Sequence, residues 1–223
     1  MKYFLFSATK GSKKKTLLHK TSTEKWFFKE RNKKPLHKLY NKALQFGKQE
    51  DVDFVVLCHD DVIIESTDFL YRLQDLHTKY DIVGVAGSTE CLIQEPVLWH
   101  IMGGGFQGGK LHGAVSHGDE TNKHVTSFGS FPHPAIVVDG VFMSVSKKAF
   151  DKVSFDETNP AGFHFYDISF CLDASLAKLR VGVGDIMITH MSPGLREFTP
   201  EFNEGQKWFL EKYEQYKGKK VAV

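Results

Sequence analysis

The sequence has no long apolar run, no paired cysteine spacing and no strong excess of one charge. Its 223 residues contain no stretch that approaches the roughly 20 apolar residues of a membrane-spanning helix. The opening Met1–Phe6 is too short for a signal peptide and fits a first β-strand. The three cysteines, Cys58, Cys91 and Cys171, form no Cys-x-x-Cys motif. Disulfides and structural zinc are therefore not expected, and a reducing cytoplasm is the expected location.

A formal net charge of +2 gives no support for nucleic-acid binding. We interpret the basic runs Lys13–Lys15 and Lys33–Lys34 as solvated surface, although such runs also attract phosphate groups or anionic membranes, which leaves peripheral membrane contact open. The length and a hydrophobic content of 41% fit one large globular domain. We expect this domain over residues 1–199, followed over residues 200–223 by a helix with an apolar stripe and a frayed basic tail.

Strand-like and helix-like segments alternate along the first half of the chain. Runs rich in apolar and β-branched residues predict strands at Tyr3–Ala8, Asp53–Cys58 and Asp81–Ala86. Helical spacing of apolar residues predicts helices at Pro35–Gly47 and Ser66–Lys79. This order predicts an α/β fold with a parallel sheet and right-handed crossovers. Further along, strands are predicted at 135–138, 141–145 and 181–185, with a helix that has Asp167 in its first turn.

The segment Ser88–Pro134 breaks this alternation. It contains five histidines, Trp99 and the glycine run Gly103–Gly105. The glycines form no dinucleotide-binding fingerprint, because they neither follow a good strand nor open a helix. The histidine spacings match no tidy set of metal ligands. We interpret the segment as a loop, with or without a hairpin, that closes over a site and helps to shape an acceptor pocket.

The most informative residues are His59, Asp60 and Asp61, which follow the strand that ends at Cys58. Carboxylates at the end of a buried strand are costly unless a cation or a ligand uses them. In open α/β sheets, ligands bind at that edge. The residues therefore predict a site for a divalent metal and an anionic ligand such as a diphosphate. The alternative is an acidic N-cap of the next helix, which accounts for one aspartate but poorly for two and a histidine.

Two residues of the second half are further candidates. Asp167 falls in the first turn of a helix, where the helix dipole favours a carboxylate, and the same position suits a general base that faces a cleft. His190 follows a strand, and an imidazole near carboxylates suits ions such as Mn²⁺. The structural alternatives are a first-turn charge for Asp167 and a surface or core histidine for His190.

Several segments together resemble glycosyltransferases of the GT-A fold, and the closest likeness is to the family 2-like group. They are residues 59–62 (HDDV), 139–143 (DGVFM), 155–157 (FDE), 162–172 (GFHFYDISFCL) and 188–190 (ITH). The likeness covers most of Tyr3–Gly194, and Gly162–Leu172 is its most specific element. It implies a Rossmann-like, open, mostly parallel mixed sheet flanked by helices, with the glycine- and histidine-rich loop as an insertion and a C-terminal helix.

The resemblance also implies an activity. This is metal-dependent transfer of a sugar, with inversion, from a nucleotide-diphosphate donor (a UDP-sugar is expected) to a glycan or another hydroxyl acceptor, as in polysaccharide biosynthesis. An Asp-x-Asp motif in the family binds Mn²⁺ or Mg²⁺. The corresponding triplet here is His59-Asp60-Asp61, in which a histidine replaces the first acid. In the family, a pair of acidic residues opens the catalytic helix. The corresponding pair here is Tyr166-Asp167, so only the aspartate carries over.

By this resemblance, Asp167 is the expected general base, and Asp61 and His190 are the expected metal ligands. Donor contacts are expected from Ser7, His59, Asp60, Asp139 and Gly140, and acceptor or lid contacts from Trp99, His164 and Tyr166. Two other classes stay open. A metal-dependent nucleotide-sugar hydrolase or nucleotidyltransferase would use the same carboxylates, and a non-catalytic binding module would hold the donor without turnover. The sequence does not determine the donor, the acceptor or the oligomeric state.

Overall fold

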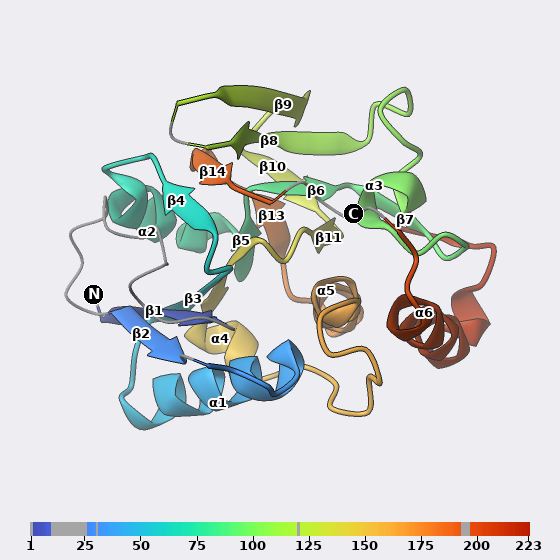
Figure 1. Cartoon of the computed structure of the whole chain (residues 1–223), viewed down its shortest axis with the longest axis horizontal. Helices are drawn as coiled ribbons and strands as arrows, with labels where there is room; N and C mark the ends of the chain where they lie inside the picture. The colour runs from blue at the N-terminus through green and yellow to red at the C-terminus, as the bar shows by residue number, and fades with distance from the viewer. Residues whose placement is uncertain (1, 10–25, 30, 120, 193–196) are drawn as a thin grey trace.

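The structure is a computed structural model that describes residues 2–9, 26–29, 31–119, 121–192 and 197–223 (Figure 1). The run Lys13–Lys15, which we expect at the surface, lies outside these residues. The described chain forms two β-sheets, a two-stranded ribbon and the helices that pack around them. Every helix in this part of the chain is too short or too polar to cross a lipid bilayer.

A seven-stranded mixed sheet forms the centre of the fold. Its spatial order is β10 (His133–Ala135), β13 (Val181–Val183), β5 (Ile82–Gly84), β12 (Phe142–Ser146), β3 (Phe54–Cys58), β1 (Tyr3–Ala8) and β2 (Trp26–Lys29). The pairs β2–β1, β1–β3 and β5–β13 are parallel, whereas β12 is antiparallel to both of its neighbours and β10 is antiparallel to β13. The mixed sheet is confirmed, and parallel pairs make up half of its pairings. All five residues of β3 are buried, as its apolar sequence predicts.

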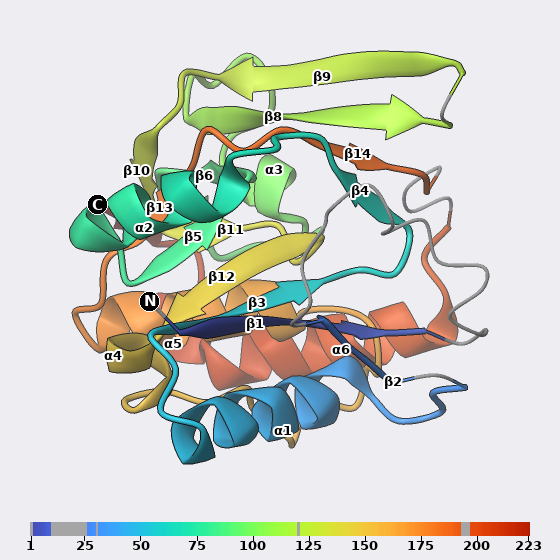
Figure 2. The same cartoon turned by 90° about the vertical axis from the view of Figure 1, so that its left-hand side faces the viewer.

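Helices cover one face of this sheet, and a second sheet lies across the other. The helices below the sheet in Figure 2 are α1 (Leu36–Gln49), α4 (Lys147–Phe150), α5 (Tyr166–Leu176) and α6 (Pro200–Lys212), while α2 (Phe69–Lys79) lies on the opposite side. Helix α2 begins three residues later than its apolar pattern predicts. The reason is a turn in which the Phe69 N–H donates to the Ser66 carbonyl at 3.2 Å.

The second sheet contains much of the segment that the sequence suggested to be a loop. Its order is β11 (Val137–Val138), β6 (Ala86–Ser88), β8 (Leu111–Gly118), β14 (Ile188–His190) and β4 (Val62–Ile64), with β9 (Lys123–Gly129) paired to β8. The hairpin β8–β9 and the short helix α3 (Trp99–Met102) therefore replace most of the expected loop. The predicted strands at 81–86 and 135–138 each divide, because the chain passes from one sheet to the other within them.

The C-terminal tail is ordered. Helix α6 begins after Thr199, whose hydroxyl accepts a hydrogen bond from the Phe202 N–H at 3.2 Å. A 3-10 turn (Glu214–Tyr216) follows, and β15 (Lys220–Ala222) then pairs antiparallel with β7 (Glu90–Leu92). The prediction of a frayed tail is wrong, because this backbone ladder is reinforced by an ion pair of 3.1 Å between Lys220 and Glu90.

Candidate active site

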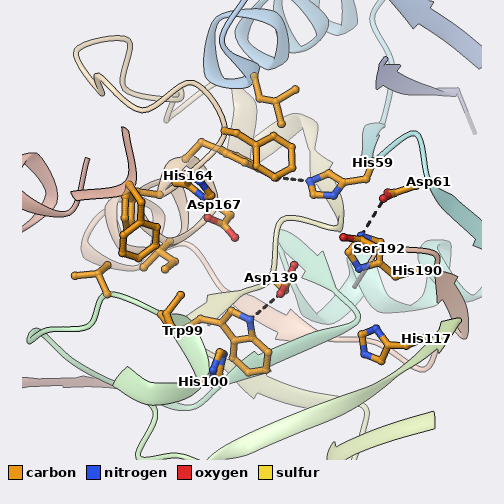
Figure 3. A pocket seen from close by; sticks show the side chains of 18 of the residues that line it. His59, Asp61, Trp99, His100, His117, Asp139, His164, Asp167, His190 and Ser192 are labelled. Atoms are coloured by element: carbon orange, nitrogen blue, oxygen red, sulfur yellow. Dashed lines mark hydrogen bonds and ion pairs between the residues drawn. The ribbon is translucent and has the colours of Figure 1, made fainter. Parts of the chain in front are cut away.

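Two antiparallel pairings bring the predicted site residues together. The end of β3 pairs with the start of β12, so the loop before β12, which contains Asp139, lies beside His59. The start of β4 pairs with the end of β14, so His190 lies opposite Val62 and next to Asp61. The first turn of α5 faces the same sheet edge (Figure 3). The result is a cavity of about 540 Å³ that these segments line from several sides.

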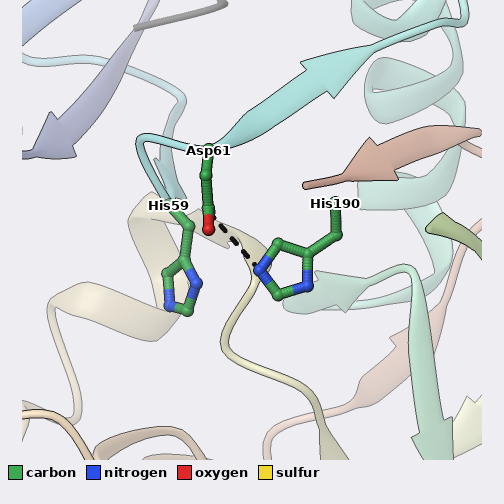
Figure 4. A group of neighbouring side chains, drawn as sticks. All are labelled: His59, Asp61 and His190. Atoms are coloured by element: carbon green, nitrogen blue, oxygen red, sulfur yellow. Dashed lines mark ion pairs between the residues drawn. The ribbon is translucent and has the colours of Figure 1, made fainter. Parts of the chain in front are cut away.

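His59, Asp61 and His190 form a compact group at one end of the cavity. One potential ligand atom from each residue lies within 4.8 Å of the other two (Figure 4). His190 Nε2 lies 3.4 Å from Asp61 Oδ1. That carboxylate oxygen is buried, and apart from this long contact with His190 no described residue donates a hydrogen bond to it. A buried carboxylate oxygen with one long contact is poorly satisfied, so the group fits a bound cation.

The charges within this group support the same reading. Burial raises the pKa of Asp61, whereas the imidazoles of His190 and His59 lower it. The lowering is the larger effect, so the pKa of Asp61 lies below its ordinary value. Burial lowers the pKa of His59, which keeps this imidazole neutral, against the opposing pull of Asp61. A neutral imidazole and an ionised carboxylate are the forms that bind metal ions. The structure thus groups His59, which we expected to contact the donor, with the two expected metal ligands.

Asp167 occupies the first turn of α5, on another side of the cavity from Asp61 and His190 (Figure 3). The residue before this helix, Phe165, adopts a left-handed conformation with φ of 65°, a costly geometry for a non-glycine residue. Asp167 Oδ2 accepts a hydrogen bond from the Gly140 N–H at 2.8 Å. Burial and then the nearby charge of Asp139 raise the pKa of Asp167 to about 7, against the lowering effect of the Gly140 N–H.

Asp139 joins this carboxylate to the opposite wall of the cavity. Its Oδ2 accepts from the Trp99 indole Nε1–H at 2.7 Å, and its Oδ1 accepts from the Val141 N–H at 2.8 Å. Both oxygens therefore accept hydrogen bonds that fix the position of the side chain. Since its charge helps to raise the pKa of Asp167, Asp139 affects the predicted base directly.

The remaining predicted residues differ in their access to the cavity. His164 lines it and packs edge-on against Phe202. Tyr166 also lines it, yet only 4% of this residue is exposed. Asp60 lies at the cavity wall, outside the compact metal-ligand group. Ser7 is fully buried, and its hydroxyl donates to the Cys58 carbonyl at 2.7 Å, so the structure gives it a role in joining β1 to β3.

An aromatic wall is the main feature of the cavity that the sequence did not reveal. Phe106 stacks on Phe128 with ring centroids 5.5 Å apart, and Phe128 packs edge-on against Trp99 at 5.1 Å. Phe106 is 64% exposed, so its outer face is free to meet a ligand. These residues come from α3, the glycine-rich turn and β9, and only the cross-strand pairing of β8 and β9 brings the last of them to the cavity.

His117 is a second residue that sequence spacing could not place. It pairs with His190 across β8 and β14, and their ring centroids are 6.2 Å apart. It lines the cavity beside the metal-ligand group. His117 and His190 are far apart in the sequence, so their spacing carries no signal. The available signal was the alternation of side chains along β8, in a segment that we expected to be a loop.

A second cavity of about 430 Å³ adjoins the first. The two share four lining residues: Ala8, Leu36, Asp60 and Phe163. Asn32, Lys33 and Lys34 also line the second cavity. The basic run Lys33–Lys34, which we interpreted as solvated surface, therefore borders a cavity that shares part of its lining with the main cavity.

Comparisons with known proteins agree with this architecture. The solved structure of A197 from STIV is similar to 86% of this chain and 86% of its own, with 16% sequence identity and a TM-score of 0.53. A likeness at that identity concerns the fold alone. The search of curated proteins finds no match.

The mixed sheet with flanking helices and a polar site at its edge defines a protein with the GT-A fold. A model of a glycosyltransferase-like family matches residues 17–221. The chain belongs to this glycosyltransferase-like family.

Proposed function

We propose that the protein transfers a sugar, with inversion, from a nucleoside-diphosphate donor to a carbohydrate hydroxyl, with Asp167 as the general base and with a divalent cation held by Asp61, His190 and His59. The observation that carries this proposal is the position of two different groups on one cavity. One is a candidate cation site, and the other is a carboxylate whose pKa is raised to about 7. Family membership supports the class of reaction.

The two adjoining cavities suit a nucleoside-diphosphate donor. A nucleoside in the second cavity would place its diphosphate near the shared residue Asp60 and the adjoining metal-ligand group. Lys33 and Lys34 would attract the phosphate charge. The cation, when bound, would supply Lewis-acid stabilisation of the leaving diphosphate. Two imidazoles and one carboxylate favour Mn²⁺ or another transition metal over Mg²⁺.

Asp167 supplies the proton chemistry. An acceptor hydroxyl must lose its proton as it attacks the anomeric carbon, and a base with a pKa near the working pH does this best. Burial beside Asp139 gives Asp167 such a pKa, while the Gly140 N–H fixes the orientation of its carboxylate. A single displacement by the acceptor needs no nucleophile from the protein and inverts the anomeric configuration.

The aromatic wall supports a carbohydrate acceptor. Sugar rings present flat C–H faces that pack on aromatic rings, and Trp99, Phe106 and Phe128 form a wall of that kind in the cavity that Asp167 also lines. The hydrogen bond from Trp99 to Asp139 fixes this indole against the residue whose charge raises the pKa of the base. The wall therefore favours a saccharide as acceptor over a small polar alcohol.

The test is a product assay with nucleotide sugars, Mn²⁺ or Mg²⁺, and an oligosaccharide acceptor library, after a thermal-shift screen of the donors. Sugar transfer that requires the acceptor and a divalent cation supports the proposal. Release of free sugar at the same rate with and without acceptor would indicate a hydrolase instead. Donor binding without turnover, unchanged in Asp167→Asn, would indicate a binding module.

A further inference from the structure

The phenolic hydroxyl of Tyr166 lies between a candidate metal ligand and the loop that contacts the base. Its oxygen is 2.8 Å from His59 Nε2 and 3.2 Å from the Gly140 carbonyl oxygen. Tyr166 is the first residue of α5, directly before Asp167. The hydroxyl therefore touches both halves of the proposed active site.

The protons at this junction can be counted. The Tyr166 hydroxyl has one proton and two partners. If this proton is donated to His59 Nε2, the contact with the Gly140 carbonyl oxygen, which can only accept, is not a hydrogen bond. If it is donated to the Gly140 carbonyl, the phenolic oxygen can accept from a protonated His59 Nε2, and this arrangement alone makes both contacts hydrogen bonds. A neutral imidazole has only one ring proton, so Nδ1 of His59 keeps its lone pair.

The two nitrogens of His59 face different neighbours. In Figure 4, one ring nitrogen is on the side of Asp61 and His190, and the other is directed away from them. The nitrogen directed away is Nε2, which contacts Tyr166. The nitrogen with the free lone pair thus faces the other two candidate ligands.

The surroundings hold the tyrosine firmly in this position. It is buried, and its ring packs edge-on against Tyr40, with centroids 5.5 Å apart. Gly140 leaves the space that the hydroxyl occupies, because a Cβ atom at residue 140 would lie 2.3 Å from the Tyr166 hydroxyl oxygen. The site therefore needs a residue without a side chain opposite a residue with a phenol.

We propose that Tyr166 is a positioning residue that fixes His59 as the Nε2-protonated tautomer and so presents Nδ1 to the cation. A hydrogen bond from the second nitrogen of a ligating histidine orients its ring and raises metal affinity. This inference rests on the proposed metal site. Because Asp167 is the next residue of the same helix, the contact also couples the position of the metal ligands to that of the base.

The first test reads the tautomer directly, in metal-free protein without donor. Long-range ¹H–¹⁵N NMR spectra of histidine-labelled protein at pH 8 distinguish protonated from unprotonated ring nitrogens, and His59→Gln assigns the signals. We expect His59 to be protonated at Nε2 in the wild type and to lose this single-tautomer signature in Tyr166→Phe. Gly140→Ala, which displaces the hydroxyl, is expected to act in the same way.

The second test measures Mn²⁺ binding by calorimetry. Tyr166→Phe keeps the packed ring but is expected to weaken Mn²⁺ binding by about 10- to 100-fold, the range for lost outer-shell partners. The matched control is Tyr213→Phe, which removes a buried hydroxyl that donates to the Asp173 carboxylate and lies outside the cavity lining. The control should leave both the His59 tautomer and Mn²⁺ affinity unchanged.

Two results would overturn the inference: a wild-type His59 protonated at Nδ1, or a Tyr166→Phe variant that keeps both the tautomer and the Mn²⁺ affinity. Failure of the proposed function has a different signature. If the wild type binds no Mn²⁺, the proposed metal site does not exist, and the contact between Tyr166 and His59 cannot serve metal binding. A protein that binds Mn²⁺ but transfers no sugar leaves the inference intact.

Discussion

Replacement of Asp167 by asparagine should strongly lower turnover and stabilise the protein at the same time. The side chain is half-buried, and its pKa is raised to about 7 by burial and by Asp139. In the unfolded chain this carboxyl loses its proton near the ordinary value of 3.8. Between these two pH values the folded state holds a proton that the unfolded state has released. The wild type therefore loses stability as the pH rises through this window.

The magnitude follows from the size of that window. A rise from 3.8 to about 7 corresponds to about 4 kcal/mol at 1.36 kcal/mol per pKa unit. Because Asp167 faces a cavity that admits water, we halve this value to about 2 kcal/mol. Asparagine carries no charge, and its amide oxygen can still accept from the Gly140 N–H. At about 2–4 °C per kcal/mol, the variant should melt about 4–8 °C above the wild type at pH 8.

The assay is urea unfolding of both proteins at pH 4 and pH 8. The difference in free energy of unfolding, variant minus wild type, should grow by about 2 kcal/mol between these pH values. The control Asp173→Asn, on the same helix, removes a carboxylate paired with Lys212 at 2.7 Å and should gain no stability at pH 8. Turnover of Asp167→Asn should fall by about 10²- to 10⁴-fold with donor affinity retained. A pH-independent stability difference, or near wild-type turnover, would refute the reasoning.

Three further predictions concern the same cavity. The turnover number should rise with pH through an apparent pKa near 7, because Asp167 must be ionised to accept a proton; a flat profile from pH 5 to 8 would contradict this. His190→Ala should weaken Mn²⁺ binding by at least about tenfold in calorimetry, and equal affinity would exclude the residue as a ligand. Phe106→Ala should raise the acceptor KM by about three- to tenfold with donor KM unchanged. Tyr71→Ala, at a 76% exposed position on α2, is its control, and equal effects of the two variants would argue against the aromatic wall.

The sequence predicted the parts of the fold that rest on local pattern. Strand β3 and helix α1 follow from an apolar run and from helical spacing with a proline at its start, and both lie where expected to within a few residues. The division of the strand predicted at 81–86 did not follow, because the passage of a chain between two sheets has no local signature. Pairing of the tail with β7 likewise depends on a distant partner.

The site shows the same limit. Asp61 and His190 were predicted, and the structure brings them to 3.4 Å of each other through the pairing of β4 and β14. The contact between His59 and Tyr166 could not be predicted, because it joins residues 107 positions apart through one hydroxyl. The aromatic wall was missed because the segment that carries Phe128 resembles a loop, and its strand is stabilised mainly by pairing with β8 rather than by burial of its own side chains.

The central claim is that one cavity holds a divalent cation at one end and a sugar acceptor beside Asp167. The most direct measurement is an anomalous difference map from crystals soaked with Mn²⁺ and a non-hydrolysable UDP-sugar. The account predicts a peak bonded to Asp61, His190 and His59 and in contact with the diphosphate. A fully bound donor without an ion at these residues, or an ion held elsewhere, would contradict it.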